Sequence, residues 1–502
     1  MTDKAAIVTV DGVSLTCAPG TELGELLGEA VPMPCGGHGK CGKCRVTVRG
    51  EVSLPTEREL RALSREELEA GVRLACQVTV TGDCSVELIR EQGKAQIREE
   101  GELPPFVSDP AFARYGIAVD IGTTTLAARL YDRRGKMLAS DTRLNPESAW
   151  GADVITRMEA CLAGHAAEIA SCIRRAVSEM AGELARDAGV GADDIDAAVI
   201  TGNTVMLHLL TGENVEPMTH APFGTSSLFG KTVTAGEIGL SSLVPETPVY
   251  LPPCAAAFVG ADMMCSLIAS EILGKPGTRL LVDIGTNGEM ILSHGGKLLA
   301  CSTAAGPAFE GAGISMGMGG RAGAVDRVRV EDGELKAHVI GDVPPVGICG
   351  SGLVDAVACL LETEALDETG YLEDDPALIA DPVSLTQEDI RMVQLAKSAV
   401  HAGMRTLLRT AGVDCAAVDE LAVAGGFGSY LDIGNAAAIG LLPEETADRV
   451  RVLGNAALAG ASMLLLSLPM RPTTEELSRT TEIVSLAANP VFAAEYMERM
   501  MF

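Results

Sequence analysis

The chain has very few aromatic residues and a shortage of positive charge. Phe, Tyr and Trp make up 3% of its 502 residues. The abundance of alanine and glycine in their place favours tightly packed α/β layers. Lys and Arg number 39 against 68 Asp and Glu, which gives a formal net charge of −29. Because an acidic surface repels phosphate backbones, we expect no nucleic-acid partner.

The sequence also lacks a segment typical of a membrane span. Residues 452–470 carry no charge over 19 positions, but they include two glycines, an asparagine, two serines and a proline. That composition indicates a buried helix in a large core. The opening residues MTDKAAIVTV run into a strand-like segment and do not resemble a signal peptide. Fourteen cysteines in such a chain indicate a reducing compartment, and we expect a cytoplasmic protein without a membrane partner.

Four cysteines near the amino end carry the most specific signal. Cys35, Cys41 and Cys44 lie in the run PCGGHGKCGKC, and Cys76 follows in LACQV after 31 intervening residues. This spacing is typical of four thiolate ligands to a [2Fe–2S] cluster. The loop's glycines permit positive φ angles, so the backbone can wrap the cluster closely. These glycines are Gly36, Gly37, Gly39 and Gly42.

Other assignments compete for the same residues. Structural zinc prefers paired C-x2–4-C units, and only one pair here has that spacing. Cys84 is a second candidate for the fourth ligand, but it lies in an alternating strand, whereas Cys76 follows the ferredoxin-like pattern LACQ. We expect His38, between the ligands, to face solvent. The nine remaining cysteines show no ligand spacing, so we expect them to pack as small hydrophobic residues.

One motif occurs twice in the rest of the chain. An apolar strand ends in DIGTTT at residues 120–125 and in DIGTNG at residues 283–288, 163 positions later. We interpret this as an internal duplication that builds two related lobes. Each Gly-Thr turn is a candidate phosphate cradle, because glycine permits close approach while hydroxyl and N–H groups donate hydrogen bonds. The predicted cradle residues are Gly122, Thr123, Thr124, Thr125, Gly285, Thr286, Asn287 and Gly288.

Acidic residues beside these turns are candidate catalytic groups. Asp120 and Asp283, at the two strand ends, can hold Mg²⁺ through water, because Mg²⁺ keeps several waters and takes one or two carboxylates. Glu310, in GPAFEGAG, either orients water or metal or only binds loop backbone, and the sequence does not decide between the two. Glycines after a later apolar strand would let an adenosine lie against the backbone. The predicted adenosine residues are Gly425, Gly426 and Phe427.

Two common nucleotide motifs are missing. No G-x4-G-K-[ST] is present, and no G-x-G-x-x-G opens a helix after a strand, which excludes a Walker A loop and a Rossmann fingerprint. The motifs that are present resemble those of the actin, heat-shock chaperone and sugar kinase superfamily of ATPases. Residues 120–125 and 283–288 match its phosphate motifs and 425–428 its adenosine motif, while 202–204 and 454–460 resemble its connecting segments.

A closer resemblance covers nearly the whole chain. Residues 1–90 contain short β-branched strands, a short helix and a charged helical segment at 55–70 with an expected solvated face. They resemble the adrenodoxin- and plant-type ferredoxin domain, a β-grasp fold. Such a domain followed by this ATPase, with NPESAWGADVITRM, CSTAAGPAFEGAG and GICGSGLVDAV, resembles the reductive activators of corrinoid-dependent methyl-transfer proteins.

The resemblance implies a multidomain α+β and α/β fold. A β-grasp ferredoxin domain would precede a duplicated, two-lobed actin-like (ribonuclease H-like) ATPase domain. We expect a ferredoxin domain at 1–90, a linker at 91–113, ATPase lobes at 114–279 and 280–450, and C-terminal helices at 451–502 that return to the first lobe.

The resemblance also implies an ATPase-coupled electron-transfer enzyme. It would use ATP, Mg²⁺ and a [2Fe–2S] cluster to pass an electron from a cellular low-potential reductant to a Co(II) corrinoid protein or corrinoid-dependent methyltransferase, regenerating Co(I). Related activators suggest a homodimer. Two alternatives stay open: an ATP-gated electron donor to another iron–sulfur enzyme of the dehydratase type, and a small-molecule kinase with a redox-sensing ferredoxin domain.

Overall fold

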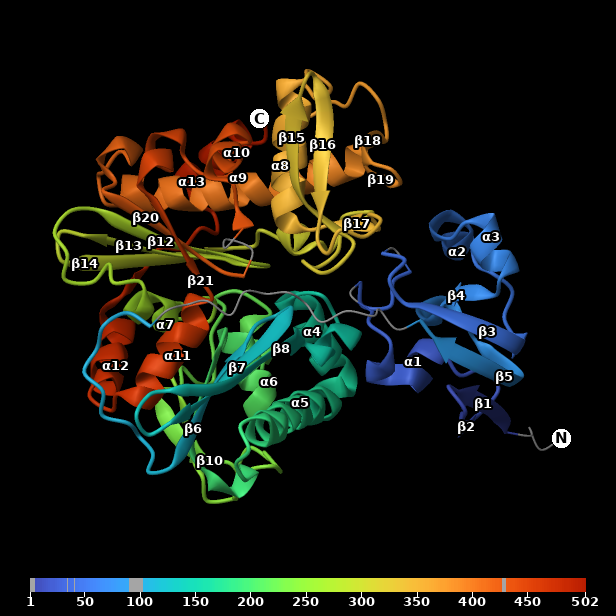
Figure 1. The fold of residues 1–502 in the computed structure, drawn as a ribbon, viewed down its shortest axis with the longest axis horizontal. Helices are drawn as coiled ribbons and strands as arrows, with labels where there is room; N and C mark the ends of the chain where they lie inside the picture. The colour runs from blue at the N-terminus through green and yellow to red at the C-terminus, as the bar shows by residue number, and fades with distance from the viewer. Residues whose placement is uncertain (1–4, 34, 40, 90–102, 427–429) are drawn as a thin grey trace. The chain divides into compact units, whose positions relative to one another are not determined.

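The chain forms two compact units in a computed structural model. The structure describes residues 5–33, 35–39, 41–89, 103–426 and 430–502. The first unit comprises Met1–Gly93 and Asn145–Ile173, and the second comprises Lys94–Leu144 and Arg174–Phe502. Figure 1 colours the chain from blue at the N-terminus to red at the C-terminus.

A five-stranded mixed sheet forms the centre of the first unit, in the order β2-β1-β5-β3-β4. The strands are β1 (Ala6–Val10), β2 (Val13–Cys17), β3 (Arg45–Val52), β4 (Val72–Leu74) and β5 (Val80–Leu88). The β1 strand pairs in parallel with β5, and the other neighbours are antiparallel. Helix α1 (Leu23–Leu27) buries Leu23 and Leu27 in the same core as Val8 and Val46. This is the predicted β-grasp arrangement.

The charged segment at 55–70 differs from its prediction. It forms two short helices, α2 (Glu57–Ala62) and α3 (Arg65–Glu69), each with a capping box at its start. Its charged face is not wholly solvated, because Glu59 is fully buried and accepts two hydrogen bonds from Arg73, at 2.8 and 2.9 Å. A buried carboxylate needs such a partner, and the sequence pattern did not reveal it.

Residues 145–173 of the first unit are helical. They contain the 3-10 turn Pro146–Ala149, helix α4 (Val154–Ala160), a π turn at Cys161–His165 and the start of α5 (Ala166–Asp187). Gly164, with φ 109°, breaks the helical run. Arg157 and Glu147 are fully buried and form an ion pair at 3.1 Å, which ties α4 to the preceding turn.

The second unit contains two six-stranded sheets whose topology matches over five strands. The first has the order β10-β11-β9-β6-β7-β8 and the second β21-β20-β12-β13-β14-β22. In each, three consecutive strands form an antiparallel meander, and a later strand pairs in parallel with the first of them. This repetition has the form expected of an internal duplication.

The strands of the first sheet are β6 (Tyr115–Ile121), β7 (Thr125–Asp132), β8 (Met137–Leu144), β9 (Ile195–Gly202), β10 (Lys231–Thr234) and β11 (Pro248–Leu251). Those of the second are β12 (Arg279–Ile284), β13 (Gly288–His294), β14 (Lys297–Thr303), β20 (Glu420–Ala424), β21 (Val450–Gly454) and β22 (Glu482–Ile483). Smaller sheets comprise β15 (Ala324–Glu331), β16 (Glu334–Val339) and β17 (Gly347–Ile348), and β18 (Ala377–Ala380) with β19 (Val383–Leu385).

Two helices lie between the six-stranded sheets. Helices α7 (Ala261–Ala269) and α11 (Ala456–Leu466) contribute to one core against the first sheet and to another against the second. They cross closely at Gly460, where an added Cβ would lie 2.0 Å from the carbonyl oxygen of Cys265. Every residue of α11 is buried, as expected, but this helix covers only part of the predicted range 452–470: the range begins in β21, and Val452 and Leu468 are exposed. Among the described residues, no helix has the length and apolar character needed to cross a membrane.

Most of the remaining helices cover the outer faces of the sheets, whereas the helix Met470–Thr480 packs against α7 and α11 (Figure 1). Helices α8 (Gly350–Glu362), α9 (Gln387–Thr410) and α10 (Ile433–Ala438) belong to the second sheet's core, against which α13 (Pro490–Glu498) packs. Helix α6 (Thr204–Thr211) follows β9, and α12 (Met470–Thr480) follows α11. Residues 91–102 of the expected linker lie outside the described residues, and Asp109 beyond them donates its N–H to the carbonyl of Leu466.

Candidate functional sites

The four predicted cluster cysteines lie in two pairs. Cys44 Sγ lies 3.3 Å from Cys76 Sγ, and Cys41 shares a thiol hydrogen bond with Cys35. Across the described residues, no three His, Cys, Asp or Glu side chains converge on one metal position. Two thiol pairs fit two irons, each with two protein ligands, better than one four-coordinate zinc.

The surrounding residues fit the expected ligand loop. All four of its glycines have positive φ. At Gly39 (φ +67°) a Cβ would also lie 2.7 Å from Cδ of Gln77, so the Gln77 side chain would have to move to make room for it. A hydrogen bond from the Cys44 thiol lowers the pKa of Cys76 to about 7, which favours a thiolate. His38 is exposed, as expected, whereas Cys84 is buried in the β-sheet core.

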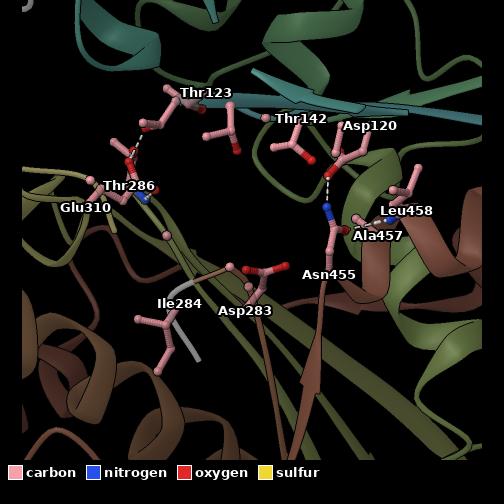
Figure 2. Close-up of a pocket in the computed structure, with 18 of the residues that line it drawn as sticks. Asp120, Thr123, Thr142, Asp283, Ile284, Thr286, Glu310, Asn455, Ala457 and Leu458 are labelled. Atoms are coloured by element: carbon pink, nitrogen blue, oxygen red, sulfur yellow. Dashed lines mark hydrogen bonds between the residues drawn. The ribbon is translucent and has the colours of Figure 1, made fainter. Parts of the chain in front are cut away.

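The two Gly-Thr turns of the second unit open onto one pocket (Figure 2). Asp120 and Asp283 are the last but one residues of β6 and β12, so the repeated strands deliver both carboxylates to this pocket. Gly122 donates its N–H to the Thr125 carbonyl at 2.9 Å, and a Cβ at Gly122 would lie 2.7 Å from that oxygen. The tight turn therefore requires glycine there.

The pocket brings together nearly all predicted nucleotide residues. Its lining includes Gly122, Thr123, Thr124, Thr125, Gly285, Thr286, Asn287, Gly425, Gly426 and Glu310. Gly288 is buried in β13 and does not line it. Phe427 lies outside the described residues. Gly425 has φ +100°, and its carbon approaches the second strand end so closely that a Cβ would lie 2.8 Å from Asp283 Oδ1.

The sequence did not single out two carboxylates of the pocket. Asp262 lies in the first turn of α7, and Glu289 is the second residue of β13, where it pairs with Asp283 across the hairpin. Glu289 Oε1 accepts the N–H of Gly260 at 2.9 Å. The position of Glu289 directly after DIGTNG was a usable signal, because hairpin pairing places it beside Asp283. Asp262 had no comparable signal, because only the fold brings α7 to the strand ends.

The carboxylates share a negatively charged, largely enclosed space. Burial raises the pKa of Asp120 to about 6, against the effect of a hydrogen bond from Asn455. Burial, followed by repulsion from Asp120 and Glu310, raises the pKa of Asp283 to about 7. Burial also raises the pKa of Glu289 to about 8 and that of Asp262 well above its usual value.

The carboxylates of the described residues do not converge as direct ligands on one metal position, but they fit a cation that is held through its own water ligands. Arg129 is the single Lys, Arg or His side chain among the described residues that line the pocket. Oxygen ligands crowded in this way suit a hard divalent ion, and the residues present are of the type that Mg²⁺ takes. Asp262 and Asp283 are half-buried in the pocket, and burial is the main cause of their raised pKa values.

Glu310 joins the two cradles. Its carboxylate accepts hydrogen bonds from the Thr286 N–H at 2.9 Å and the Thr286 hydroxyl at 2.7 Å. It also accepts a hydrogen bond from the hydroxyl of Thr124, on the other turn. On the first sheet, Asn203 donates to Thr123 Oγ1 at 3.0 Å. The hydroxyl and N–H groups that could bind phosphate oxygens are therefore hydrogen-bonded to protein side chains in this structure.

Three family descriptions match successive parts of the chain. Residues 8–81 match a 2Fe-2S iron-sulfur cluster binding domain. Residues 115–275 match the RACo middle region, and residues 277–502 match the C-terminal domain of RACo, the ASKHA domain.

Named relatives and a solved structure agree with these matches. The corrinoid activation enzyme RamQ of Eubacterium limosum is 35% identical over 77% of this chain and 70% of its own length. The [Co(II) methylated amine-specific corrinoid protein] reductase of Methanosarcina barkeri is 25% identical over 74% of this chain and 72% of its own. The structure of a reductive activator for corrinoid, iron-sulfur protein aligns with a TM-score of 0.72 at 27% identity, covering 99% of this chain and 98% of the other.

Proposed function

Because the chain belongs to the family of reductive activators of corrinoid proteins, we propose that it is an ATP-dependent reductive activase for a Co(II) corrinoid protein. When bound, the reduced [2Fe–2S] cluster would supply the one electron that converts Co(II) of the partner to Co(I), and the cluster would itself become oxidised. The observation that carries this proposal is the presence of both modules in one chain: a cysteine loop with paired thiols and a pocket built by two phosphate cradles.

The four cysteines Cys35, Cys41, Cys44 and Cys76 hold the cluster in this proposal. The 3.3 Å approach of Cys44 and Cys76, and the thiol hydrogen bond between Cys35 and Cys41, support one pair for each iron. The cluster supplies one-electron chemistry when bound. The loop glycines let the backbone follow it closely, and the core position of Cys84 supports its exclusion from the ligand set.

The pocket of the second unit binds ATP with Mg²⁺ in this proposal. Bound Mg²⁺ would neutralise phosphate charge. Asp120 and Asp283 orient its water ligands from the two strand ends, and Asp262 and Glu289 add negative charge beside them. The Gly-Thr turns donate to phosphate oxygens, while Gly425, Gly426 and Phe427 border the adenosine. We assign Glu310 to the catalytic group because it contacts both cradles.

ATP is needed because the electron moves uphill. A plant-type [2Fe–2S] centre has a potential of about −400 mV, and the Co(I) state of a corrinoid is a stronger reductant. For one electron, each gap of about 59 mV costs roughly a factor of ten in the equilibrium. A change in the angle between the two cradles, driven by nucleotide, can supply free energy by changing how the activator binds its partner.

The remaining partners follow from the same proposal. A cellular low-potential reductant reloads the cluster, and the acceptor is a corrinoid protein or a corrinoid-dependent methyltransferase. We propose a cytoplasmic location because none of the fourteen cysteines forms a disulfide, and a reducing compartment preserves the ten thiols that are not proposed cluster ligands. By analogy with related activators we propose a homodimer. We also propose five segments: a ferredoxin domain, a linker, two ATPase lobes and C-terminal helices, at 1–90, 91–113, 114–279, 280–450 and 451–502.

The test is ATP-dependent formation of Co(I). The protein is purified without oxygen and mixed with a chemical reductant and a Co(II) corrinoid protein, and the Co(I) absorbance is followed with ATP, with ADP or without nucleotide. We expect the signal only with ATP, and we expect Cys76→Ser and Asp120→Asn each to abolish it. Equal Co(I) formation without nucleotide, or none with any corrinoid protein of the same cell, would contradict the proposal. Phosphate transfer to a small molecule would favour the kinase alternative.

A further inference from the structure

Asn455 lies at the point where the chain passes from the second six-stranded sheet to the helix pair between the sheets. Strand β21 ends at Gly454, which has φ +67°, and α11 begins at Ala456. Asn455 is therefore the one residue between the two elements. The Gly454 carbonyl also accepts the N–H of Gly425 at 3.1 Å, which places Asn455 next to the second sheet's glycine turn.

Both ends of the Asn455 amide are used. Oδ1 accepts the N–H of Leu458 at 2.8 Å and caps α11, while Nδ2 donates to Asp120 Oδ2 at 3.0 Å (Figure 2). The cap requires an acceptor and the carboxylate requires a donor, so the two bonds together fix the amide's orientation. An aspartate at this position could accept the capping hydrogen bond but could not donate to Asp120. A serine could also cap the helix, but its hydroxyl is too short to reach Asp120 at the same time.

Asp120 depends on this contact for its orientation. Asp120 is 9% exposed, and the hydrogen bond from Asn455 is the single one that its carboxylate makes within the part of the chain that the structure describes. Asp120 is joined to Asn455 through Oδ2, which leaves Oδ1 for the pocket. A buried carboxylate with a single, charge-assisted hydrogen bond has its rotamer set largely by that bond.

We propose that Asn455 is a positioning residue that holds the Asp120 carboxylate in the orientation required for magnesium-dependent nucleotide binding. The proposal rests on the proposed function only for the presence of a magnesium nucleotide in this pocket. Because Asn455 stays hydrogen-bonded to α11 and to Asp120, a change in the angle between the two sheets would occur by rotation of the backbone at Gly454. The first turn of α11 and the first phosphate cradle then move as one body.

The matched variants are Asn455→Ser and Asn435→Ser. Serine at 455 keeps a cap for α11 and removes the donor to Asp120. Asn435 also donates to a buried carboxylate, Asp355 Oδ1 at 2.7 Å, but neither residue lines the pocket. Asn435→Ser therefore measures the general effect of losing an Asn–Asp hydrogen bond in the same unit. Thermal unfolding of both variants checks that the fold is retained.

The measurement is binding of a non-hydrolysable ATP analogue to the full, cluster-loaded protein across a magnesium titration. For Asn455→Ser we expect the half-saturating magnesium concentration to rise about tenfold, the factor for loss of one hydrogen bond to a charged group. Affinity for the analogue in EDTA should stay unchanged, which a merely structural role would not predict. Asn435→Ser should behave as wild type in both titrations.

Three outcomes measured on the variants would overturn the proposal. These are an unchanged magnesium requirement in Asn455→Ser, an equal loss of affinity with and without magnesium, and the same shift in Asn435→Ser. Wild-type protein that binds the analogue without any magnesium dependence would also overturn it, yet would leave ATP-dependent corrinoid reduction intact. Failure to form Co(I) by a wild type with normal magnesium-dependent binding would contradict only the proposed function.

Discussion

Glu310 and Thr286 are joined twice, because the Glu310 carboxylate accepts both the backbone N–H and the hydroxyl of Thr286. The same carboxylate reaches Thr124 on the opposite cradle. A nucleotide's phosphate oxygens would compete for these donors, and they carry the same sign of charge as Glu310. We therefore predict that Glu310→Ala binds a non-hydrolysable ATP analogue more tightly, by roughly tenfold, while ATP hydrolysis falls.

Glu310→Gln is the matched control for that change. It removes the charge and keeps the length and one oxygen acceptor, so its affinity should lie between those of wild type and Glu310→Ala. Equilibrium titration gives the affinities, and phosphate release gives the hydrolysis rate. Weaker binding in Glu310→Ala would place the carboxylate among the groups that bind the metal-nucleotide directly.

The cysteine pairing gives a second prediction. Cys76 lies 3.3 Å from Cys44, whereas Cys84 is buried in the sheet core. Cys76→Ser should purify with little or no iron and sulfide, because a hydroxyl is a poor ligand for this cluster. Cys84→Ser should keep both, together with the visible absorbance. Iron content, sulfide content and absorbance after anaerobic purification decide this, and the opposite pattern would assign the fourth ligand to Cys84.

Sequence reasoning worked best where chemistry repeats a short pattern. The cysteine spacing and the two D-I-G-T turns identified both modules, because cluster and phosphate binding constrain neighbouring residues along the chain. Glycine at positions 122 and 425 was predictable for the same reason, since the backbone there leaves no room for a Cβ. The buried α11 was also predictable, from its composition of small and apolar residues.

Contacts between distant segments were not predictable in this way. Asp262 reaches the pocket because α7 packs between two sheets, and nothing in its neighbours along the sequence indicates that. Glu59 was expected on a solvated face, but it lies in the core because Arg73, fourteen residues later, can neutralise it there. The break between α2 and α3 depends on the Ser64 capping box, a signal that the charged composition concealed.

The buried pair Glu59 and Arg73 predicts a stability effect with a defined pH dependence. Burial raises the pKa of Glu59, but hydrogen bonds from Arg73, Thr56 and Leu74 outweigh burial and lower the pKa overall. A lowered pKa means that the pair stabilises the fold above the usual carboxyl range and loses that contribution as the pH falls through the folded-state pKa. Glu59→Gln leaves Arg73 buried without its partner, and should cost about 3 to 5 kcal/mol of unfolding free energy at neutral pH.

Denaturant unfolding of the first unit, measured at pH 7 and near pH 4, gives the unfolding free energies of wild type and Glu59→Gln. The difference between wild type and Glu59→Gln should shrink at the lower pH. Glu69→Gln is the control, because Glu69 and its partner Arg65 are exposed and such pairs contribute about 0 to 1 kcal/mol. A Glu59→Gln protein as stable as Glu69→Gln would contradict the buried pairing.

Repulsion among the pocket carboxylates gives a fourth prediction. Burial and the charges of Glu289, Asp120 and Asp283 raise the pKa of Asp262. Without a divalent ion, Asp262→Asn should therefore raise the melting temperature, because one buried negative charge is removed from the cluster. With magnesium and an ATP analogue the order should reverse, since the variant loses a group that favours the cation. Thermal unfolding of both proteins, in EDTA and in magnesium with the ATP analogue, tests the two expectations. A lower melting temperature for Asp262→Asn than for wild type in EDTA would contradict the proposed repulsion.

The crossing of α7 and α11 depends on the absence of a side chain at Gly460. A Cβ there would lie 2.0 Å from the carbonyl oxygen of Cys265, so Gly460→Ala must push the helices apart at the point where both sheets pack on them. We expect a loss of about 1 to 3 kcal/mol or more in unfolding free energy. Gly182→Ala, in α5, has its nearest neighbour at 3.6 Å and should be neutral or stabilising by up to about 1 kcal/mol. Because α11 begins directly after Asn455, Gly460→Ala should also raise the magnesium concentration required for nucleotide binding. Gly182→Ala should leave that requirement unchanged. A stable Gly460→Ala protein with wild-type nucleotide binding would show that α7 and α11 can separate without disturbing Asp120.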